Sequence, residues 1–150
     1  MKNYTSLVPV GRTIGRIEEI LARAGALSIH KEYVDGRISA LSFTLSAEQA
    51  KAGADIAVRL PVEEGAVYSV LMADKKKPQA GTAERIREQA GRTAWKLMQD
   101  WIEIQISMIE MRQAEILQVF MPYIWAGGKT LYRALVDGGF KMLTEGKAAK

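Results

Sequence analysis

The chain has 150 residues, of which 48% are hydrophobic and 25% charged, and its formal net charge is +4. The absence of cysteine excludes disulfides, thiolate metal sites and cysteine nucleophiles. No apolar run approaches the ~20 residues that span a bilayer. This balance is typical of a soluble globule with its own core. We expect one α+β domain over residues 1–150, with a frayed tail at about 145–150.

A short helix is predicted near the N-terminus. Thr13 is a suitable N-cap residue, and Gly25 is placed to end the helix because glycine accepts the left-handed conformation that often follows one. Apolar side chains form one face between these two positions: Ile14, Ile17, Ile20, Leu21 and Ala24. We expect this face to pack against the core.

Three short strands follow this helix. Residues 27–33 alternate apolar and polar side chains, and residues 37–45 do the same. Between them, Asp35 and Gly36 predict a type I′ turn, because both central positions of that turn need a positive φ. Residues 55–60 supply the third strand. One face of this mostly antiparallel sheet is apolar, so helices must cover it.

The second half of the chain is predicted to be helical. Residues 62–74 form one helix and residues 75–81 a loop. A much longer helical segment covers residues 82–119, with Thr82 as its N-cap and Gly91 as its only glycine.

Proline and glycine punctuate the end of the chain. Pro122 breaks the long helical segment, and residues 129–136 form a last short helix after a joint at Gly127 and Gly128. The predicted order is α-β-β-β-α-α-α. The fold class is therefore α+β: a three-stranded, mostly antiparallel sheet with a β-hairpin, packed on helices, one of them long.

The long helix predicts an oligomer. A helix over residues 83–112 would be about 45 Å long, whereas a compact chain of this size is about 40 Å across. The helix therefore bends, for example near Ser107, or a second copy covers part of it. One of its two apolar stripes has heptad-like spacing and is the predicted oligomer interface: Ala94, Leu97, Trp101, Ile104, Met108 and Met111. A packed core helix is the alternative interpretation.

Catalytic and metal-binding residues are not evident in the sequence. His30, the only histidine, lies on the polar side of a predicted strand with no nucleophile placed beside it. Glu103 and Glu110 share one helix face, which fits a solvated surface better than a Mg²⁺ site. No glycine-rich phosphate-binding motif is present. We therefore predict a non-enzymatic protein without a catalytic residue, a metal site or a cofactor.

A basic stretch gives the main functional indication. Seven cations lie between residues 75 and 96, and Glu84 and Glu88 are the only acids there. Helix N-terminal amides also attract phosphate. The predicted nucleic-acid contact consists of Lys75, Lys76, Lys77, Arg85, Arg87 and Arg92. A solvated face, with Glu88 paired to Arg92, is the alternative. Trp125 is the aromatic residue expected to be exposed for base stacking.

Most of the chain, residues 14–143, carries a family resemblance. Its specific blocks are IHKEYVDGRISALSF, IAVRLPVEEGAVYSVL and REQAGRTAWKLMQDWIEIQISMIEMRQAEILQVFMPYI. They resemble a family of small proteins of temperate phages and prophages, without an established activity. The resemblance implies a gene among replication, recombination and regulatory genes, and the cytoplasm of a bacterial host cell. The first residues agree with that location, because they lack the apolar core of a signal peptide.

Two functional hypotheses follow. The first is a non-enzymatic phage accessory protein, a homo-oligomer that binds DNA or RNA in replication or recombination. The second is a host-directed binder of a protein or small ligand, for instance an inhibitor or sponge that opposes a bacterial defence system. A small hydrolase ranks third, because no site can be nominated for it.

Overall fold

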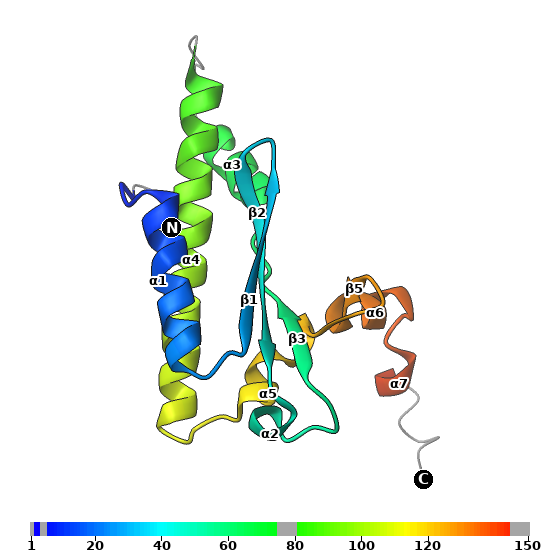
Figure 1. Cartoon of the computed structure of the whole chain (residues 1–150). Coiled ribbons are helices and arrows are strands. Elements are labelled where there is room, and N and C mark those ends of the chain that lie inside the picture. The colour runs from blue at the N-terminus through cyan, green and yellow to red at the C-terminus, as the bar shows by residue number, and fades with distance from the viewer. Residues whose placement is uncertain (1, 4–5, 75–80, 145–150) are drawn as a thin grey trace.

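The computed structural model describes residues 2–3, 6–74 and 81–144 (Figure 1). Its elements confirm the predicted α+β class. In chain order they are α1 (Val10–Arg23), β1 (Ser28–Val34), β2 (Arg37–Leu45), α2 (Ala47–Ala50), β3 (Ile56–Arg59), α3 (Glu64–Ala73), α4 (Thr82–Glu110), α5 (Ile116–Phe120), the 3-10 helix η1 (Met121–Tyr123), β4 (Trp125–Ala126), β5 (Lys129–Thr130), α6 (Leu131–Asp137) and α7 (Lys141–Thr144).

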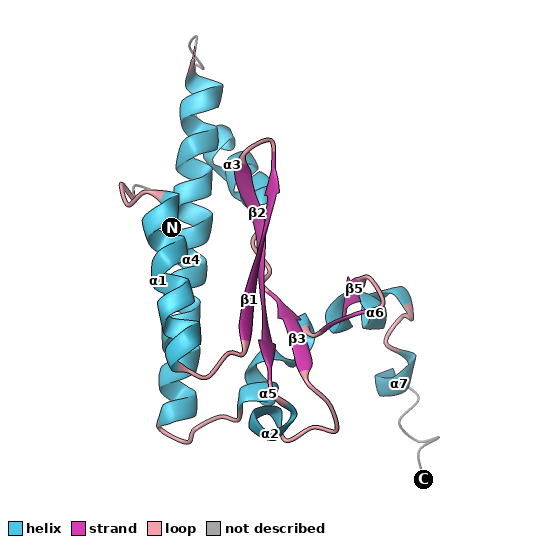
Figure 2. Ribbon diagram, viewed as in Figure 1, coloured by secondary structure: helices cyan, strands magenta, loops and turns pink. Residues whose placement is uncertain are grey.

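The predicted hairpin is confirmed. Strands β1 and β2 are antiparallel and meet at Asp35 and Gly36, which have φ values of 50° and 76°. Strand β3 pairs antiparallel with β2, so the sheet order is β1-β2-β3 (Figure 2). Phe43 stands opposite Ile29 on one side and Val58 on the other, which places these three side chains on the same face of the sheet.

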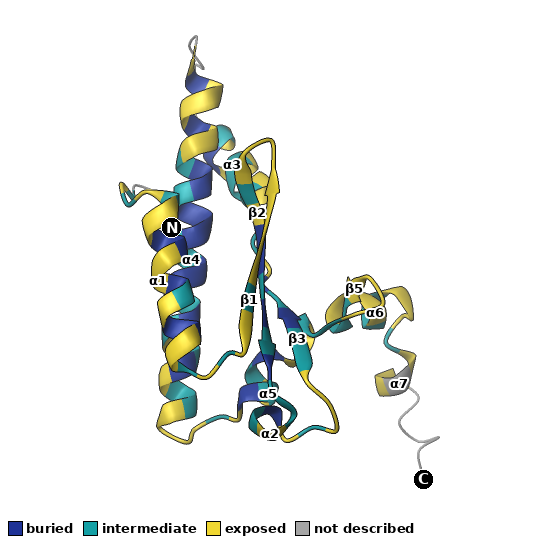
Figure 3. Cartoon of the chain, in the orientation of Figure 1, coloured by how far each residue is buried: buried dark blue, intermediate teal, exposed yellow. Residues whose placement is uncertain are grey.

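Helices α1 and α4 cover that apolar face. They lie side by side and run in the same direction, with α4 along the full length of the sheet (Figure 1). The buried side of α4 lies toward the sheet and α3 (Figure 3). Trp95 and Ile102 are seven residues apart, which places them on the same face of the helix. Both side chains are fully buried. Together with Leu41, Phe43 and Val58 they form the centre of the main core.

Two helix starts differ from the sequence prediction. Helix α1 begins at Val10 with Pro9 as its N-cap, so Thr13 is not the cap. The carbonyl of Pro9 accepts the backbone N–H groups of Arg12 and Thr13, and the buried hydroxyl of Thr13 also donates to it. Helix α4 likewise has Gly81, with a φ of 81°, at its N-cap position, and Thr82 is its first residue.

Helix α4 is a single element of 29 residues, about 43 Å long. It runs straight, so the first of the two predicted alternatives, a bend near Ser107 for example, does not occur (Figure 1). It ends nine residues earlier than the predicted segment, because Arg112 adopts a left-handed conformation with a φ of 60°. The chain then turns into α5.

Gly91 has a packing role in the middle of α4. Its backbone is buried, and a Cβ atom there would lie 3.2 Å from both Arg37 Nη2 and Glu64 Oε1. Glu64 Oε1 accepts a 3.0 Å hydrogen bond from Nε1 of the buried Trp95. Glycine therefore leaves room for the carboxylate that satisfies this indole N–H.

We expect Gly15→Ala to stabilise the protein by about 0.5–1 kcal/mol, because Gly15 is exposed within α1 and has open space around it. Gly91→Ala gains the same helix propensity but must displace Glu64 and Arg37, so it should stabilise less or destabilise. Urea denaturation of both variants measures the difference. Equal stabilisation would show that Gly91 is not constrained by its neighbours.

Phe120 connects α5 to the sheet and to α4. Its fully buried ring lies edge-on to Phe43 at 5.2 Å and to Trp101 at 5.7 Å. We expect Phe120→Ala to lower the free energy of unfolding by about 3–5 kcal/mol, because it leaves a cavity in the core. Urea denaturation measures the loss, and Leu27→Ala at an exposed position, expected within about 0.5 kcal/mol, is the control. A loss of less than about 1 kcal/mol at Phe120 would contradict this packing.

Candidate functional site

The predicted basic stretch begins outside the described residues, where Lys75, Lys76 and Lys77 lie. Arg85 and Arg87 stand on the first two turns of α4 and are exposed. The end of α4 that carries them extends past α1 and is supported by α3 (Figure 1).

Arg92 has a structural role. Its Nε atom donates to the carbonyl of Ser6 at 3.2 Å, and its Nη2 atom donates to Gln89 Oε1 at 2.7 Å. Gln89 Nε2 also donates to Ser6, at 3.0 Å. These bonds anchor the N-terminal segment on α4, so the three predicted arginines are not equivalent.

Ion pairing separates the cations of this protein into two groups. More than half of the lysines and arginines in the described residues pair with a carboxylate: Lys2, Arg16, Arg23, Lys31, Arg37, Lys51, Arg59, Lys96 and Lys129. Arg85 and Arg87 form no such pair with any described residue. Glu84 and Glu88 are exposed one turn apart on α4, and the side chain of Arg87 instead reaches the ring of Tyr68 on α3, 5.7 Å from its centroid.

A cavity of about 420 Å³ lies beside this contact. The hairpin, α3 and α4 form its walls, which include Arg37, Ser39, Glu64, Tyr68 and Arg87. The carboxylate of Glu64 lies 3.8 Å from Arg37. The cavity is therefore lined by two arginines: Arg37, whose charge is partly neutralised by Glu64, and Arg87, which has no ion pair with the described residues.

A second cavity, of about 770 Å³, separates β3 from the C-terminal hairpin and α6. Trp125 on β4 is half-buried there, rather than exposed as expected, and the guanidinium of Arg59 covers its ring at 4.7 Å. Arg59 also pairs with Glu32 across the sheet. Tyr132 and Arg133, at the start of α6, line the same cavity.

The C-terminal hairpin follows a main-chain bridge to the sheet and is joined to α6 by an ion pair. Ile124 forms an antiparallel bridge with Val58, and Gly127 and Gly128 both take positive φ at the turn. Lys129 Nζ lies 2.8 Å from Asp137 Oδ2. The hydrogen bond from this ammonium group lowers the pKa of the Asp137 carboxyl below its ordinary value.

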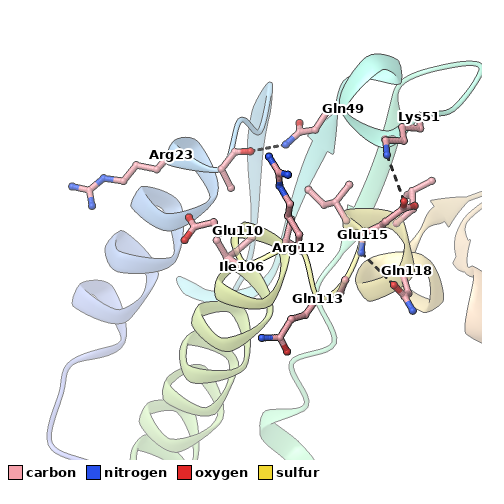
Figure 4. Close-up of a pocket in the computed structure, with 15 residues that line it drawn as sticks. Arg23, Gln49, Lys51, Ile106, Glu110, Arg112, Gln113, Glu115 and Gln118 are labelled. Atoms are coloured by element: carbon pink, nitrogen blue, oxygen red, sulfur yellow. Dashed lines mark hydrogen bonds and ion pairs between the residues drawn. The ribbon is translucent and has the colours of Figure 1, made fainter.

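A third cavity, of about 700 Å³, lies where α1, α2 and α4 end and α5 begins (Figure 4). Its polar side chains are largely occupied by internal bonds. Gln49 Nε2 donates to the carbonyl of Ala24 at 2.5 Å, Lys51 pairs with Glu115 at 3.5 Å, and Glu115 and Gln118 form a capping box at the start of α5. These contacts indicate a structural joint between helices.

The structure does not bring His30, Glu103 and Glu110 together into a catalytic or metal site. His30 is exposed on β1, opposite Ser42. Glu103 accepts from Gln99 and pairs with Arg16 at 3.4 Å, while Glu110 is exposed. Within residues 2–3, 6–74 and 81–144, no three His, Asp or Glu side chains are grouped as a metal site requires.

Some residues of the predicted oligomer stripe are buried within the chain, and others are exposed. Ala94 is buried within the chain, and Trp101 packs edge-on against Phe120 and Tyr123. Leu97 and Met108 are half-buried. Ile104 and Met111 are 57% and 69% exposed, so the outer part of this stripe is open to a partner.

Two site residues, Arg59 and Arg133, escaped sequence reasoning, and so did the position of the aromatic residues Tyr68 and Tyr132 in the walls of the cavities. These four residues lie on three different elements, and nothing in their spacing indicates that they meet. The one available signal was Trp125 beside the glycine pair.

Comparisons with known protein families, curated proteins and solved structures found no match to this chain. No helix among the described residues is long and apolar enough to cross a membrane.

Proposed function

We propose that this protein binds nucleic acid through the N-terminal end of α4, as a non-enzymatic accessory protein of phage or prophage replication or recombination. The observation that carries the proposal is that Arg85 and Arg87 are exposed and form no ion pair with the described residues. A phosphate can bind to them without breaking an existing pair.

The charge around this end supports the proposal. Lys75, Lys76 and Lys77 lie five to seven residues before α4 in the sequence and add three cations to this part of the chain. Backbone N–H groups at the start of a helix also favour anions. Paired cations elsewhere, such as Arg23 with Glu19 at 2.7 Å, would first have to leave their carboxylates.

The double variant Arg85→Glu with Arg87→Glu should bind oligonucleotides at least tenfold more weakly than the wild type. Each lost phosphate contact should also reduce the slope of log K against log salt by about 0.9 on duplex DNA. Fluorescence anisotropy at several salt concentrations measures both quantities.

Arg112→Glu is the matched control for this experiment, because Arg112 is an exposed arginine without an ion pair in the described residues, just beyond the other end of α4. It should leave affinity and slope nearly unchanged. If both variants lost the same affinity, the effect would come from net charge alone, and the assignment of binding to the N-terminal end of α4 would be overturned. Absence of binding by the wild type at low salt would favour a host-directed binder, which co-purification from host lysate then tests.

We also propose that two copies associate through the predicted oligomer stripe of α4, whose outer part is exposed. Leu97, Trp101, Ile104, Met108 and Met111 alternate in spacing between four and three, which is the repeat that matches one helix to another. Ile104 and Met111 stand open at the centre and end of this run. A second α4 has the same repeat, so the face is complementary to itself.

Ile104→Glu should convert a dimer to a monomer at micromolar concentrations, because it puts a charge at the centre of the interface. Sedimentation velocity measures the change in mass. Val70→Glu, on the exposed side of α3, is the control and should leave the mass unchanged. A wild-type protein that is monomeric at all concentrations would overturn the dimer.

A further inference from the structure

We infer that the cavities beside α3 and beside β4 form one track that binds a single strand of nucleic acid. This inference rests on the proposed function and adds to it the form of nucleic acid and a second region of contact. The two cavities share Ser39 and Val62 as lining residues, so one opens beside the other around the start of β2.

An arginine lies on an aromatic ring in each cavity. Arg87 covers Tyr68 in the smaller one, and Arg59 covers Trp125 in the larger one. Aromatic faces hold unpaired bases by stacking, and the adjacent guanidinium groups can contact both the base and the phosphate next to it. The track thus repeats one recognition unit at its two ends.

The larger cavity offers further groups to a strand. Tyr132 is 52% exposed, and Arg133 forms no ion pair with the described residues. Of the five cations along the combined lining, Arg87 and Arg133 form no ion pair with the described residues. The other three are paired: Arg37 with Glu64, Arg59 with Glu32 and Lys129 with Asp137. Glu64 is already engaged by Trp95 and Arg37, which further reduces the negative field that a strand would meet.

The position of the rings favours a single strand over a duplex. Tyr68 and Trp125 are half-buried in the walls of the cavities and do not stand out on a flat surface. The faces of paired bases are covered by their neighbours in a duplex and cannot reach such rings. Unstacked bases can enter the cavities one at a time while the phosphates stay near the arginines.

Tyr132→Leu and Arg133→Ala, made together, test the end of the track that is remote from Arg85. The probe is a fluorescent oligothymidine of about 15 nucleotides, a length near the upper site sizes of single-strand binding domains. Loss of one stacked base should weaken its binding by about 5- to 100-fold. Binding of a blunt duplex of the same length through the α4 end should change by less than about twofold.

Tyr33→Leu is the matched control, since Tyr33 is 59% exposed and lines neither cavity of the track. Both replaced tyrosines are open to solvent, and thermal melts of the two variants should coincide with that of the wild type within a few degrees. A second measurement uses Trp125→Phe. Oligothymidine should quench tryptophan emission in the wild type, and this variant should lose most of the quenching.

Failure of the track can be distinguished from failure of the proposed function. If oligothymidine binds the wild type and the Tyr132 and Arg133 double variant equally well, and Trp125→Phe keeps the quenching, the track is wrong while the α4 site stands. If neither oligothymidine nor duplex binds the wild type at low salt, both proposals fail. Displacement of the oligonucleotide by micromolar free nucleotide would overturn the track in favour of a small-molecule pocket.

Discussion

The hydrogen bond from the buried indole of Trp95 to the carboxylate of Glu64 organises this molecule. It joins the middle of α4 to the first turn of α3, and the same carboxylate faces Arg37 just after the hairpin turn. A buried indole N–H without a partner would destabilise the folded state by about 1–3 kcal/mol, so the fold favours the arrangement in which Glu64 accepts this hydrogen bond. This arrangement also favours a residue without a side chain at Gly91, because a Cβ atom there would lie 3.2 Å from both Glu64 Oε1 and Arg37 Nη2. The position of α3 against α4, and with it the contact of Tyr68 with Arg87, depends on this bond together with the apolar cluster of Leu71, Ile86 and Ala90 between the two helices.

The parts of the fold that local chemistry determines were predictable from the sequence. The Asp35 and Gly36 turn and the end of α1 at Gly25 depend on positive φ values, which few residue types accept readily. The helix boundaries that failed depend on tertiary context. Pro9 became a cap through its carbonyl, and α4 ended where Arg112 took a left-handed conformation that a sequence pattern does not indicate. Gly91 looked unfavourable in a helix, and only the packing explains it.

The candidate site also has one part that the sequence could predict and another that depends on the tertiary structure. Arg85 and Arg87 could be nominated because they are close together in the sequence. That neither forms an ion pair with the part of the chain that the structure describes depends on where the carboxylates lie in space. Arg92 was nominated on the same grounds, and its bonds to Ser6 and Gln89 give it a structural role. The contact of Arg59 with Trp125 joins residues that are distant in the chain, through the bridge between Val58 and Ile124. Such a contact becomes visible only when strand pairing is known.

Helix α4 presents different chemistry on different faces and at different ends. Its helical period puts Trp95 and Ile102 in the core while Ile104, two residues later, faces away from it. Its first two turns carry Arg85 and Arg87, which form no ion pair with the described residues, more than four turns before Ile104. Because such distant surface positions contribute nearly additively to stability, a charge placed at Ile104 should leave both the core and the basic end intact. Association between copies and nucleic-acid binding can therefore be removed one at a time. A dimer would also bring two basic ends into one particle, so that binding to long strands would gain from effective concentration while binding to short ones would not.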